Sequence, residues 1–580
     1  MKRLLPNIEM KRIIVTILAL MMMAGGAYAQ YSGGSGSEDK PYIIKTADDL
    51  VALSNYFSGK GDKTYYHYKL VDSIDMAGKT FVPIGGLSKS LGKYKPVVGN
   101  SFVGHFNGGG YVIKNLKVAV SFSSNDKCVG FFGIVGNNDG TTVIDSLTIE
   151  YDGLGYGNSD NVGGLAGKVQ GKVVVRNCCV KSEGNFEARG LSGGLLGSVD
   201  AISLKVENCS VEAPMFFYGS NCGGLIGYVY YCSEFLLKSS YYNGVIEFKK
   251  QIIGGLVGLV GEETVGSVEN CGFNGSIVKS VDADAEIGTV GGCVGEMKNA
   301  SLENCFSVAD TIYCSSNVGG LVGRLAGNSF ISNCYSKGVI KIKAKEDDFV
   351  GGNFNISVGL IDGDPKIEHV YAQNDVLDDT DGNGYAPEKL FPQLYMQSGC
   401  FAKYMNDRVG KTVWYEDVDS VNYGYPIPAG LKISANSGSG SAPSCHPIVR
   451  TDTVLGIGSS SAKAYGSFAF FSNPDQPIDQ PIEDEYGFEV SKEGAGDWRK
   501  FTPDEKVSKK DTLVSVSGSI TDLESETPYE LRAFVIYEGK TYYGKIVEFE
   551  TSGREVNAEG FYEIRSREDM EWLGDCASKG

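Results

Sequence analysis

The stretch that decides the fold reads Gly254-Gly255-Leu256-Val257-Gly258, and it is one of six close copies of the same phrase. The copies begin at Gly163, Gly193, Gly223, Gly254, Gly291 and Gly319, which are 30, 30, 31, 37 and 28 residues apart. A period of about 30 residues predicts a solenoid, because one such unit cannot bury its apolar side alone and stacks on its neighbours.

A second phrase follows five of the six copies: an apolar residue, a polar residue and then Asn-Cys. The five pairs are Asn177-Cys178, Asn208-Cys209, Asn270-Cys271, Asn304-Cys305 and Asn333-Cys334. The third unit has Ser239-Ser240 at this place. Asparagine suits a corner, because its side chain can bond backbone groups and can stack on the asparagine of the next unit.

The units are predicted to be β coils, which makes the fold class all-β. Apolar and polar residues alternate with a period of two, and no window keeps the stripe of a helix. Three short runs, separated by corners rich in Gly, Asn and Ser, close one turn of a right-handed parallel β-helix. Neighbouring coils then lie about 4.8 Å apart. The paired glycines allow corner conformations and a close approach of adjacent coils.

The repeats resemble those of a known family, the GLUG-motif repeat proteins of bacteria. The resemblance is carried by Gly-Gly-Leu-Val-Gly at 319–323 and Asn-Cys-Tyr-Ser-Lys-Gly at 333–338, and it covers about half of the chain. It implies an exported or surface protein of a kind often grouped with adhesins and with the non-catalytic parts of large surface proteases. It implies no reaction.

Composition divides the chain into six parts. They are a signal peptide at 1–29, a linker at 30–40, the β-helix with its GLUG-type repeats and end caps at 41–430, a linker at 431–447, a β-sandwich at 448–552 and the truncated start of a second solenoid at 553–580. Lys11 and Arg12, the apolar run 13–24 and Ala27-Tyr28-Ala29 indicate the signal. No later stretch offers the roughly 20 apolar residues of a membrane span.

Three segments are expected to cover the ends of coils. A strand and a short helix at 42–53 should cover the mouth of the first coil and shield its open edge. The aromatic segment 414–426 should close the far end. Residues 562–573 repeat the pattern of 42–53, so we expect a second solenoid to begin there and the 580 residues to be a fragment.

The part at 448–552 alternates apolar and polar residues over short strands, which predicts an antiparallel sandwich. Its last strands, around Tyr529 and Phe549, resemble those of fibronectin type III modules. The resemblance implies that Tyr529 packs at a corner and that the module is a spacer.

Charge and cysteine content narrow the class of protein. The net charge is −18, and the absence of a basic patch excludes nucleic acid as a partner. Five of the 14 cysteines occupy the same place in successive units, where parallel side chains in register favour buried thiols over disulfides. Three pairs stay open as exceptions: Cys178 with Cys179, Cys222 with Cys232, and Cys400 with Cys445.

The sequence contains no recognisable catalytic motif. None of its four histidines stands in a zinc-peptidase pattern, and no nucleophile elbow occurs. The carboxylates Asp282, Asp284 and Glu286 cluster in the longest insertion between units, where a solvated loop is the plainer interpretation. We therefore expect no enzyme activity and no cofactor.

Two weak binding sites are suggested. Asp379, Asp381 and Asn383 match the first half of a calcium loop, but the twelfth position is Leu390, where a bidentate carboxylate should be. An ordinary Asp/Gly-rich loop has the same composition. Tyr65, Tyr66 and Tyr68 could stack on sugar rings, or equally could pack beside the first coil.

These observations predict an exported or cell-surface structural or adhesion protein that presents a repetitive solenoid surface to an extracellular glycan or protein. No transmembrane segment is expected after removal of the signal. Two alternatives stay open: a carbohydrate-active β-helix enzyme, and the non-catalytic front part of a larger surface enzyme such as a peptidase.

Overall fold

The computed structural model describes the chain in segments. The described residues are 31–59, 64–90, 93–96, 100–118, 128–156, 160–249, 252–280, 288–314, 317–342, 354–355, 357–373, 385–433, 443, 445–471, 485–505, 513–537, 539–554, 556–557, 561–562, 564 and 566–579. The expected signal peptide at 1–29 lies outside them. The chain forms two compact units, 1–391 with 408–440 and 392–407 with 441–580.

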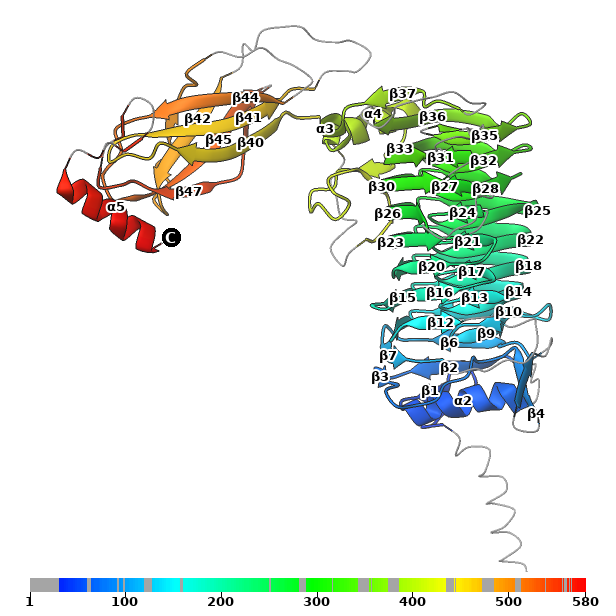
Figure 1. Cartoon of the computed structure of the whole chain (residues 1–580). Helices are drawn as coiled ribbons and strands as arrows, with labels where there is room; N and C mark the ends of the chain where they lie inside the picture. The colour runs from blue at the N-terminus through cyan, green and yellow to red at the C-terminus, as the bar shows by residue number, and fades with distance from the viewer. Residues whose placement is uncertain are drawn as a thin grey trace, which may run out of the picture. The chain divides into compact units, whose positions relative to one another are not determined.

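The first unit is a parallel β-solenoid, as the repeat predicts, built from a 27-stranded and an 8-stranded sheet (Figure 1). It opens with β1 (Tyr42–Ile44), α2 (Ala47–Gly59), β2 (Tyr66–Leu70), β3 (Ile74–Asp75), the hairpin of β4 (Leu87–Ser90) and β5 (Lys93–Pro96), β6 (Gly104–Asn107) and β7 (Val112–Leu116). The strands that end on the glycine pairs, or lie in register with them, are β8 (Cys128–Val129), β13 (Asn161–Gly163), β17 (Leu191–Gly193), β21 (Asn221–Gly223), β24 (Ile252–Gly254), β27 (Thr289–Gly291), β31 (Asn317–Gly319) and β34 (Phe354–Asn355).

The remaining solenoid strands lie on either side of the asparagine corner. Before it run β9 (Phe132–Val135), β10 (Thr141–Asp145), β14 (Ala166–Arg176), β18 (Leu196–Glu207), β22 (Ile226–Lys238), β25 (Val257–Glu269), β28 (Val294–Lys298), β29 (Ser301–Glu303), β32 (Val322–Ala326) and β35 (Val358–Asp362). After it run β11 (Thr148–Tyr151), β12 (Leu154–Tyr156), β15 (Cys179–Ser182), β16 (Phe186–Ala188), β19 (Ser210–Glu212), β20 (Met215–Phe217), β23 (Tyr241–Phe248), β26 (Gly272–Lys279), β30 (Phe306–Cys314) and β37 (Lys389–Phe391). Two strands, β33 (Phe330–Ile342) and β36 (Lys366–Gln373), pass through it.

One turn of the coil, called a rung below, can hold four strands where the sequence predicted three runs. In the rung that ends at Gly223 these are β18, β19, β20 and β21. The run after the corner divides at Pro214, which has no N–H to donate to the ladder. In the next rung the same run is continuous as β23, and β18 pairs in parallel with β22, Leu196 opposite Ile226.

The asparagine corners are left-handed. The backbone φ is 53° at each asparagine of the five Asn-Cys pairs and 47° at Ser239. Asparagine tolerates this conformation better than other residues with a Cβ. The expected ladder forms as well, since Asn304 Nδ2 donates to Asn270 Oδ1 at 3.0 Å and Asn333 Nδ2 donates to Asn304 Oδ1 at 2.7 Å.

The glycine pairs allow neighbouring backbones to approach closely, as predicted. The other prediction, that they adopt unusual corner conformations, is wrong. None of the six described pairs has a φ in the left-handed range. A Cβ built on Gly223 would lie 2.2 Å from the carbonyl oxygen of Ile226 and 2.6 Å from the N of Gly258 in the next rung. The corners therefore leave no room for a side chain.

The cysteines of the corner are thiols, as predicted. Cys178, Cys209, Cys271, Cys305 and Cys334 are buried in the apolar core and form no disulfide. Burial raises the pKa of the Cys209 and Cys305 thiols well above its ordinary value. Of the pairs left open, only Cys400 with Cys445 is a disulfide.

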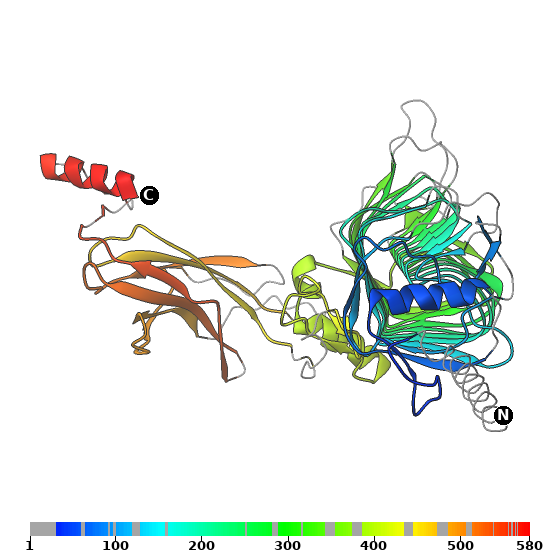
Figure 2. The ribbon, with the colours of Figure 1, turned by 90° about the horizontal axis from the view of Figure 1, so that it is seen from below.

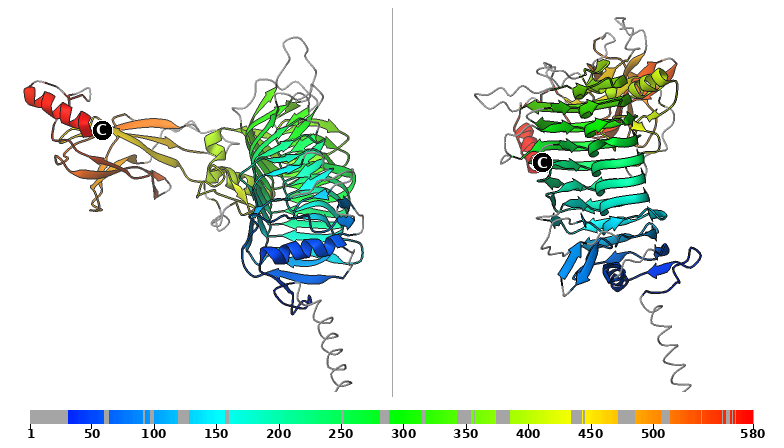
Figure 3. Two further views of the ribbon diagram at one scale, coloured as in Figure 1. Left: turned by 60° about the horizontal axis from the view of Figure 1, so that its bottom comes forward. Right: turned by 90° about the vertical axis from the view of Figure 1, so that its right-hand side faces the viewer.

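Helix α2 covers the first rung, as the sequence predicted. It starts with a capping box, in which the N–H of Asp49 donates to Thr46 Oγ1 at 3.2 Å and the N–H of Thr46 donates to Asp49 Oδ2 at 2.9 Å. Leu50, Leu53 and Phe57 face the rung and are fully buried. Figures 2 and 3 show the helix lying across the end of the coil.

The aromatic segment near the end of the first unit lies along the side of the rungs, so the prediction that it closes the far end is wrong. We call residues 411–431 the strap; it contains the pair β38 (Trp414–Tyr415) and β39 (Ile427–Pro428). Trp414 packs on Tyr335 with ring centroids 5.2 Å apart. Asn270 Nδ2, two rungs before Tyr335, donates to Ala429 O at 3.2 Å. The strap thus crosses several rungs.

Asp417 holds the turn of the strap together. Its carboxylate accepts hydrogen bonds from the N–H groups of Val421, Asn422 and Gly424 at 3.0, 2.7 and 2.8 Å. The side chain is buried, and this burial outweighs the three bonds, so the pKa of Asp417 is raised above its ordinary value.

The strap should therefore be less stable at neutral pH than in mild acid. An acid whose pKa is higher in the folded chain stabilises it most below the ordinary value of 3.8, and this stabilisation is lost as the pH rises through the raised pKa. The free energy of unfolding of the wild type minus that of Asp417→Asn should accordingly fall between pH 3.8 and neutrality. Urea unfolding followed by tryptophan fluorescence measures it, and a difference that does not change with pH would contradict the assignment.

The second unit consists of two antiparallel sheets that share one apolar cluster. One sheet holds β40 (Ile448–Leu455), β41 (Ala462–Ala469) and β44 (Val514–Ile520), and the other holds β42 (Tyr486–Lys492), β43 (Arg499–Phe501), β45 (Pro528–Tyr537), β46 (Lys540–Tyr543) and β47 (Val547–Glu550). The helices α3 (Gln393–Met396), most of α4 (Gly399–Val409), and α5 (Arg567–Lys579) belong to this unit. The disulfide joins Cys400 of α4 to Cys445, just before β40.

Within the described ranges, no helix has the length and apolar character needed to cross a membrane.

Candidate binding surfaces

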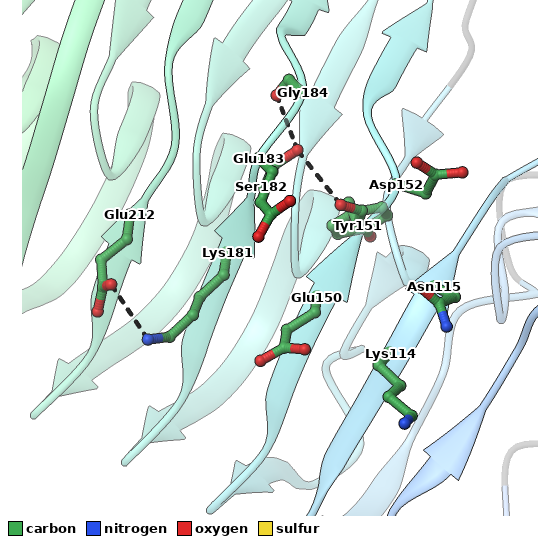
Figure 4. Close-up of a pocket in the computed structure, with 10 residues that line it drawn as sticks. All are labelled: Lys114, Asn115, Glu150, Tyr151, Asp152, Lys181, Ser182, Glu183, Gly184 and Glu212. Atoms are coloured by element: carbon green, nitrogen blue, oxygen red, sulfur yellow. Dashed lines mark hydrogen bonds and ion pairs between the residues drawn. The ribbon is translucent and has the colours of Figure 1, made fainter.

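A groove on the outer face of the solenoid is lined almost entirely by polar side chains. Its volume is about 490 Å³, and it runs across β7, β11, β15 and β19 (Figure 4). The lining residues are Lys114, Asn115, Glu150, Tyr151, Asp152, Lys181, Ser182, Glu183, Gly184 and Glu212. We call this site the charged groove.

Charges of opposite sign alternate from rung to rung in the charged groove. The register places Glu150 opposite Lys181 and Lys181 opposite Glu212. Lys181 Nζ lies 3.1 Å from Glu212 Oε2. Partial burial opposes the charge of Lys181, but the hydrogen bond to Glu212 outweighs it, so the pKa of Lys181 is raised.

A second column of the same kind precedes the asparagine corner. Its register runs through Asp145, Arg176, Glu207, Lys238 and Glu269, whose signs alternate over five rungs. Arg176 Nε lies 2.8 Å from Asp145 Oδ2, and Lys238 Nζ lies 3.3 Å from Glu269 Oε2. Alternation thus marks both sides of the corner.

The charged groove is suited to binding polar groups. Its floor is closed by Tyr151, which is buried and donates to Gly164 O at 2.6 Å, so no aromatic face is open there. Two rungs, about 10 Å, separate Glu150 from Glu212, and Lys181 lies between them. Among the described residues no group of three or more His, Cys, Asp and Glu could hold a metal.

The tyrosines selected from the sequence do not form one surface. Tyr65 donates a hydrogen bond to Asn137 Oδ1. Tyr66 packs on Tyr42 with ring centroids 5.4 Å apart. Tyr68 is 1 % exposed and belongs to the core under α2, so a sugar cannot stack on it and that part of the prediction is wrong.

The other sequence candidates lie in segments that the structure does not describe. These are the calcium-loop residues Asp379, Asp381 and Asn383 and the insertion carboxylates Asp282, Asp284 and Glu286.

An exposed cluster of tyrosines, which the sequence analysis missed, lies on β22. Tyr230 is 57 % and Tyr231 39 % exposed, and the rings of Tyr228 and Tyr230 are 5.6 Å apart at 75°. We call these three residues the tyrosine patch. Ile202 on the preceding rung and Val265 on the following one are exposed as well.

A β-bulge creates the tyrosine patch. Val199 and Asp200 of β18 lie opposite Val229 and Tyr231 of β22, so Tyr230 is an extra residue in β22, and the consecutive residues Tyr230 and Tyr231 are both exposed. Strict alternation would bury Tyr231. Alternation with a period of two therefore does not predict this surface, although the pattern Tyr-x-Tyr-Tyr is visible at 228–231.

Polar groups flank the tyrosine patch. Asp200 and Glu263 lie opposite Tyr231 on the two neighbouring rungs. Burial, followed by the nearby Tyr230, Glu296 and Glu263, raises the pKa of Tyr228. The Tyr228 hydroxyl therefore stays neutral. The carboxylates of Asp200 and Glu263, which lie opposite Tyr231, can accept hydrogen bonds from hydroxyl groups of a ligand.

Comparison with known proteins agrees with the repeat. A family model described as the GLUG motif matches residues 315–342, which run through β31, β32 and β33. The chain carries a GLUG motif. This GLUG segment contains the last of the six glycine pairs and the last Asn-Cys pair.

Three further proteins are similar to parts of the chain. A candidate Gly-rich membrane protein of Evansella cellulosilytica is 32% identical over 26% of this chain and 17% of its own length. An immunoglobulin A1 protease of Streptococcus pneumoniae is 30% identical over 21% of this chain and 6% of its own. The crystal structure of a candidate immunoglobulin A1 protease of Bacteroides ovatus has 17% identity and a TM-score of 0.39, covering 70% of this chain and 97% of that one. The chain thus spans less than a fifth of the length of the Evansella protein and of the Streptococcus protease.

Proposed function

We propose that this GLUG-motif chain is an exported or cell-surface solenoid that binds an extracellular glycan at the tyrosine patch without transforming it. The observation that carries the proposal is the exposure of Tyr230 and Tyr231 beside carboxylates on both neighbouring rungs. The face of an aromatic ring is electronegative and attracts the polarised C–H groups of a sugar ring. Large exposed apolar side chains of this kind mark interaction sites.

The relatives support the location. One is named as a membrane protein, and another is named as a protease of immunoglobulin A1. Both fit the export signal expected at residues 1–29. The net charge of −18 makes polyanionic ligands poor candidates, because they would be repelled.

Replacing Tyr230 and Tyr231 by serine should weaken glycan binding by about 5- to 140-fold, because each stacked ring contributes about 0.5–1.5 kcal/mol. The chain is first tested on an array of host mucin-type, plant cell-wall and bacterial capsular glycans, and the affinity for a bound glycan is then measured by calorimetry. Tyr111→Ser, which removes a 37 % exposed tyrosine elsewhere on the solenoid, is the matched control.

Two outcomes would overturn this proposal. One is an array without binding from folded protein. The other is binding that the serine variants leave unchanged but Lys181→Glu abolishes, which would assign the ligand to the charged groove. New reducing ends released from a bound polysaccharide would contradict the non-catalytic part and favour a carbohydrate-active enzyme.

A second candidate function is the non-catalytic part of a larger surface peptidase, favoured by the similarity to an immunoglobulin A1 protease. An antibody against residues 31–433 would then detect a cellular product much larger than 62.1 kDa. A single band near that mass would exclude it.

We also propose that the second unit is a fibronectin type III-like spacer. Tyr529 Oη accepts a hydrogen bond from the N–H of Glu524, five residues upstream, at 2.9 Å, as a corner tyrosine does. A crystal structure of this unit with a strand order unlike that module would disprove the assignment.

A further inference from the structure

Residues 562–573 repeat the segment that begins the solenoid. In this repeat Ile564 corresponds to Ile44, Met570 to Leu50 and Leu573 to Leu53. Both copies lead from a short extended piece into a helix of 13 residues, α2 in the first copy and α5 in the second. The two helices therefore carry two large apolar residues, three positions apart, at the same distance from their start.

The same capping box starts both helices. In α5 the N–H of Asp569 donates to Ser566 Oγ at 3.1 Å, and the N–H of Ser566 donates to Asp569 Oδ2 at 2.6 Å. These bonds repeat those between Thr46 and Asp49 in α2. The two helices thus start with the same hydrogen bonds.

The apolar faces of the two helices differ only in what covers them. Ile44, Leu50 and Leu53 are 0 % exposed, because they pack on the first rungs. The corresponding residues of α5 are 41 %, 59 % and 45 % exposed. The described residues of the second unit therefore leave this face of α5 open.

Another part of α5 is already held. Tyr562 packs on Trp572 with ring centroids 4.7 Å apart. Arg554 lies 5.3 Å from the centre of the Trp572 ring and pairs with Asp569. Trp572 has no counterpart in α2, where Ala52 stands at its place. The tryptophan fixes the helix to the segment before it and leaves Met570 and Leu573 exposed.

We propose that residues 562–579 form the cap of a second parallel β-solenoid, whose first rung packs its apolar mouth on Ile564, Met570 and Leu573. The occupant is identified by the first copy, in which Ile44 ends β1, β1 pairs in parallel with β2, and the pattern shares one apolar cluster with Tyr68 and Phe102. Such a mouth is a row of buried aliphatic and aromatic side chains ending in an unpaired parallel edge.

A cap exchange tests the proposal in the full chain. Residues 42–53 are replaced by the sequence of 562–573, and the matched control carries the same replacement with serine in place of the residues copied from Met570 and Leu573. We expect the exchanged chain to keep its β signal by circular dichroism and to melt within about 5 °C of the wild type, since Leu50 is the one buried apolar residue of 42–53 that changes, and it becomes a methionine of similar volume. The serine control should melt much earlier or aggregate.

Two results would overturn the proposal. The first is an exchanged chain that behaves like its serine control, because the second segment would then be unable to cap a rung. The second is a wild-type dimer in sedimentation that Met570→Asp with Leu573→Asp prevents, because the face would then belong to a second copy of the chain. If the double variant is a monomer like the wild type and melts at the same temperature, the face is not covered within this chain, as the proposal expects.

Discussion

Replacing Gly254 by alanine is expected to abolish the folded solenoid around its fourth repeat. A Cβ at this position would lie 1.9 Å from the carbonyl oxygen of Val257 and 2.7 Å from the N of Gly295. Both atoms belong to backbone, one in the same corner and one in the next rung, so no side chain can move to make room. We expect a loss of at least about 4 kcal/mol, measured as the shift of the urea midpoint by circular dichroism.

Gly153→Ala separates this clash from the ordinary cost of a side chain on glycine. Gly153 has a φ of 73°, and a Cβ there would meet nothing within 4 Å. Its substitution should cost only about 1–2 kcal/mol, the penalty of the left-handed conformation. If Gly254→Ala costs no more than Gly153→Ala, close approach is not the reason for the paired glycines.

The second large effect is expected from Leu53→Asp in α2. Leu53 is 0 % exposed, and the new carboxylate would be buried against the first rung without a partner. We expect a loss of about 3–5 kcal/mol, the size seen for an uncompensated buried charge. Because α2 would leave the rung, the parallel edge of the first strands would open to other chains, and sedimentation should show aggregates.

Asn55→Asp is the control for this variant. Asn55 is exposed on the same helix, and the substitution adds the same charge. It should leave the melting temperature and the monomeric state unchanged. A Leu53→Asp chain that is equally monomeric and equally stable would show that the helix is dispensable for the solenoid.

The repeat made most of the solenoid predictable. The period of the glycine pairs, the place of each Asn-Cys pair and the cap formed by α2 all follow from local patterns. The strap did not follow from them. Its position depends on Trp414 meeting Tyr335, a contact between residues far apart in the sequence that no local pattern encodes.

The binding surfaces were less predictable than the fold. The sequence correctly pointed to an aromatic strand, but Tyr68 is buried in the core, Tyr66 packs on Tyr42, and Tyr65 is bound to Asn137. Exposure of Tyr231 depends on a bulge, in which β22 has one residue more than β18. The charged groove depends on stacking residues about 30 positions apart, which becomes visible only once the rungs are aligned.

The alternating columns beside the asparagine corner bear on how a repetitive chain avoids folding out of frame. Each rung resembles the others, so a rung that looped out would let its two neighbours pair with little loss of apolar contact. Such a slip would place Arg176 against Lys238 and Glu207 against Glu269, as the present register implies. Like charges directly opposite on paired strands are destabilising. Between Asp145 and Glu269 the column therefore penalises the omission of a single rung. The alternation ends there, because Glu269 lies opposite Glu303 in the next rung.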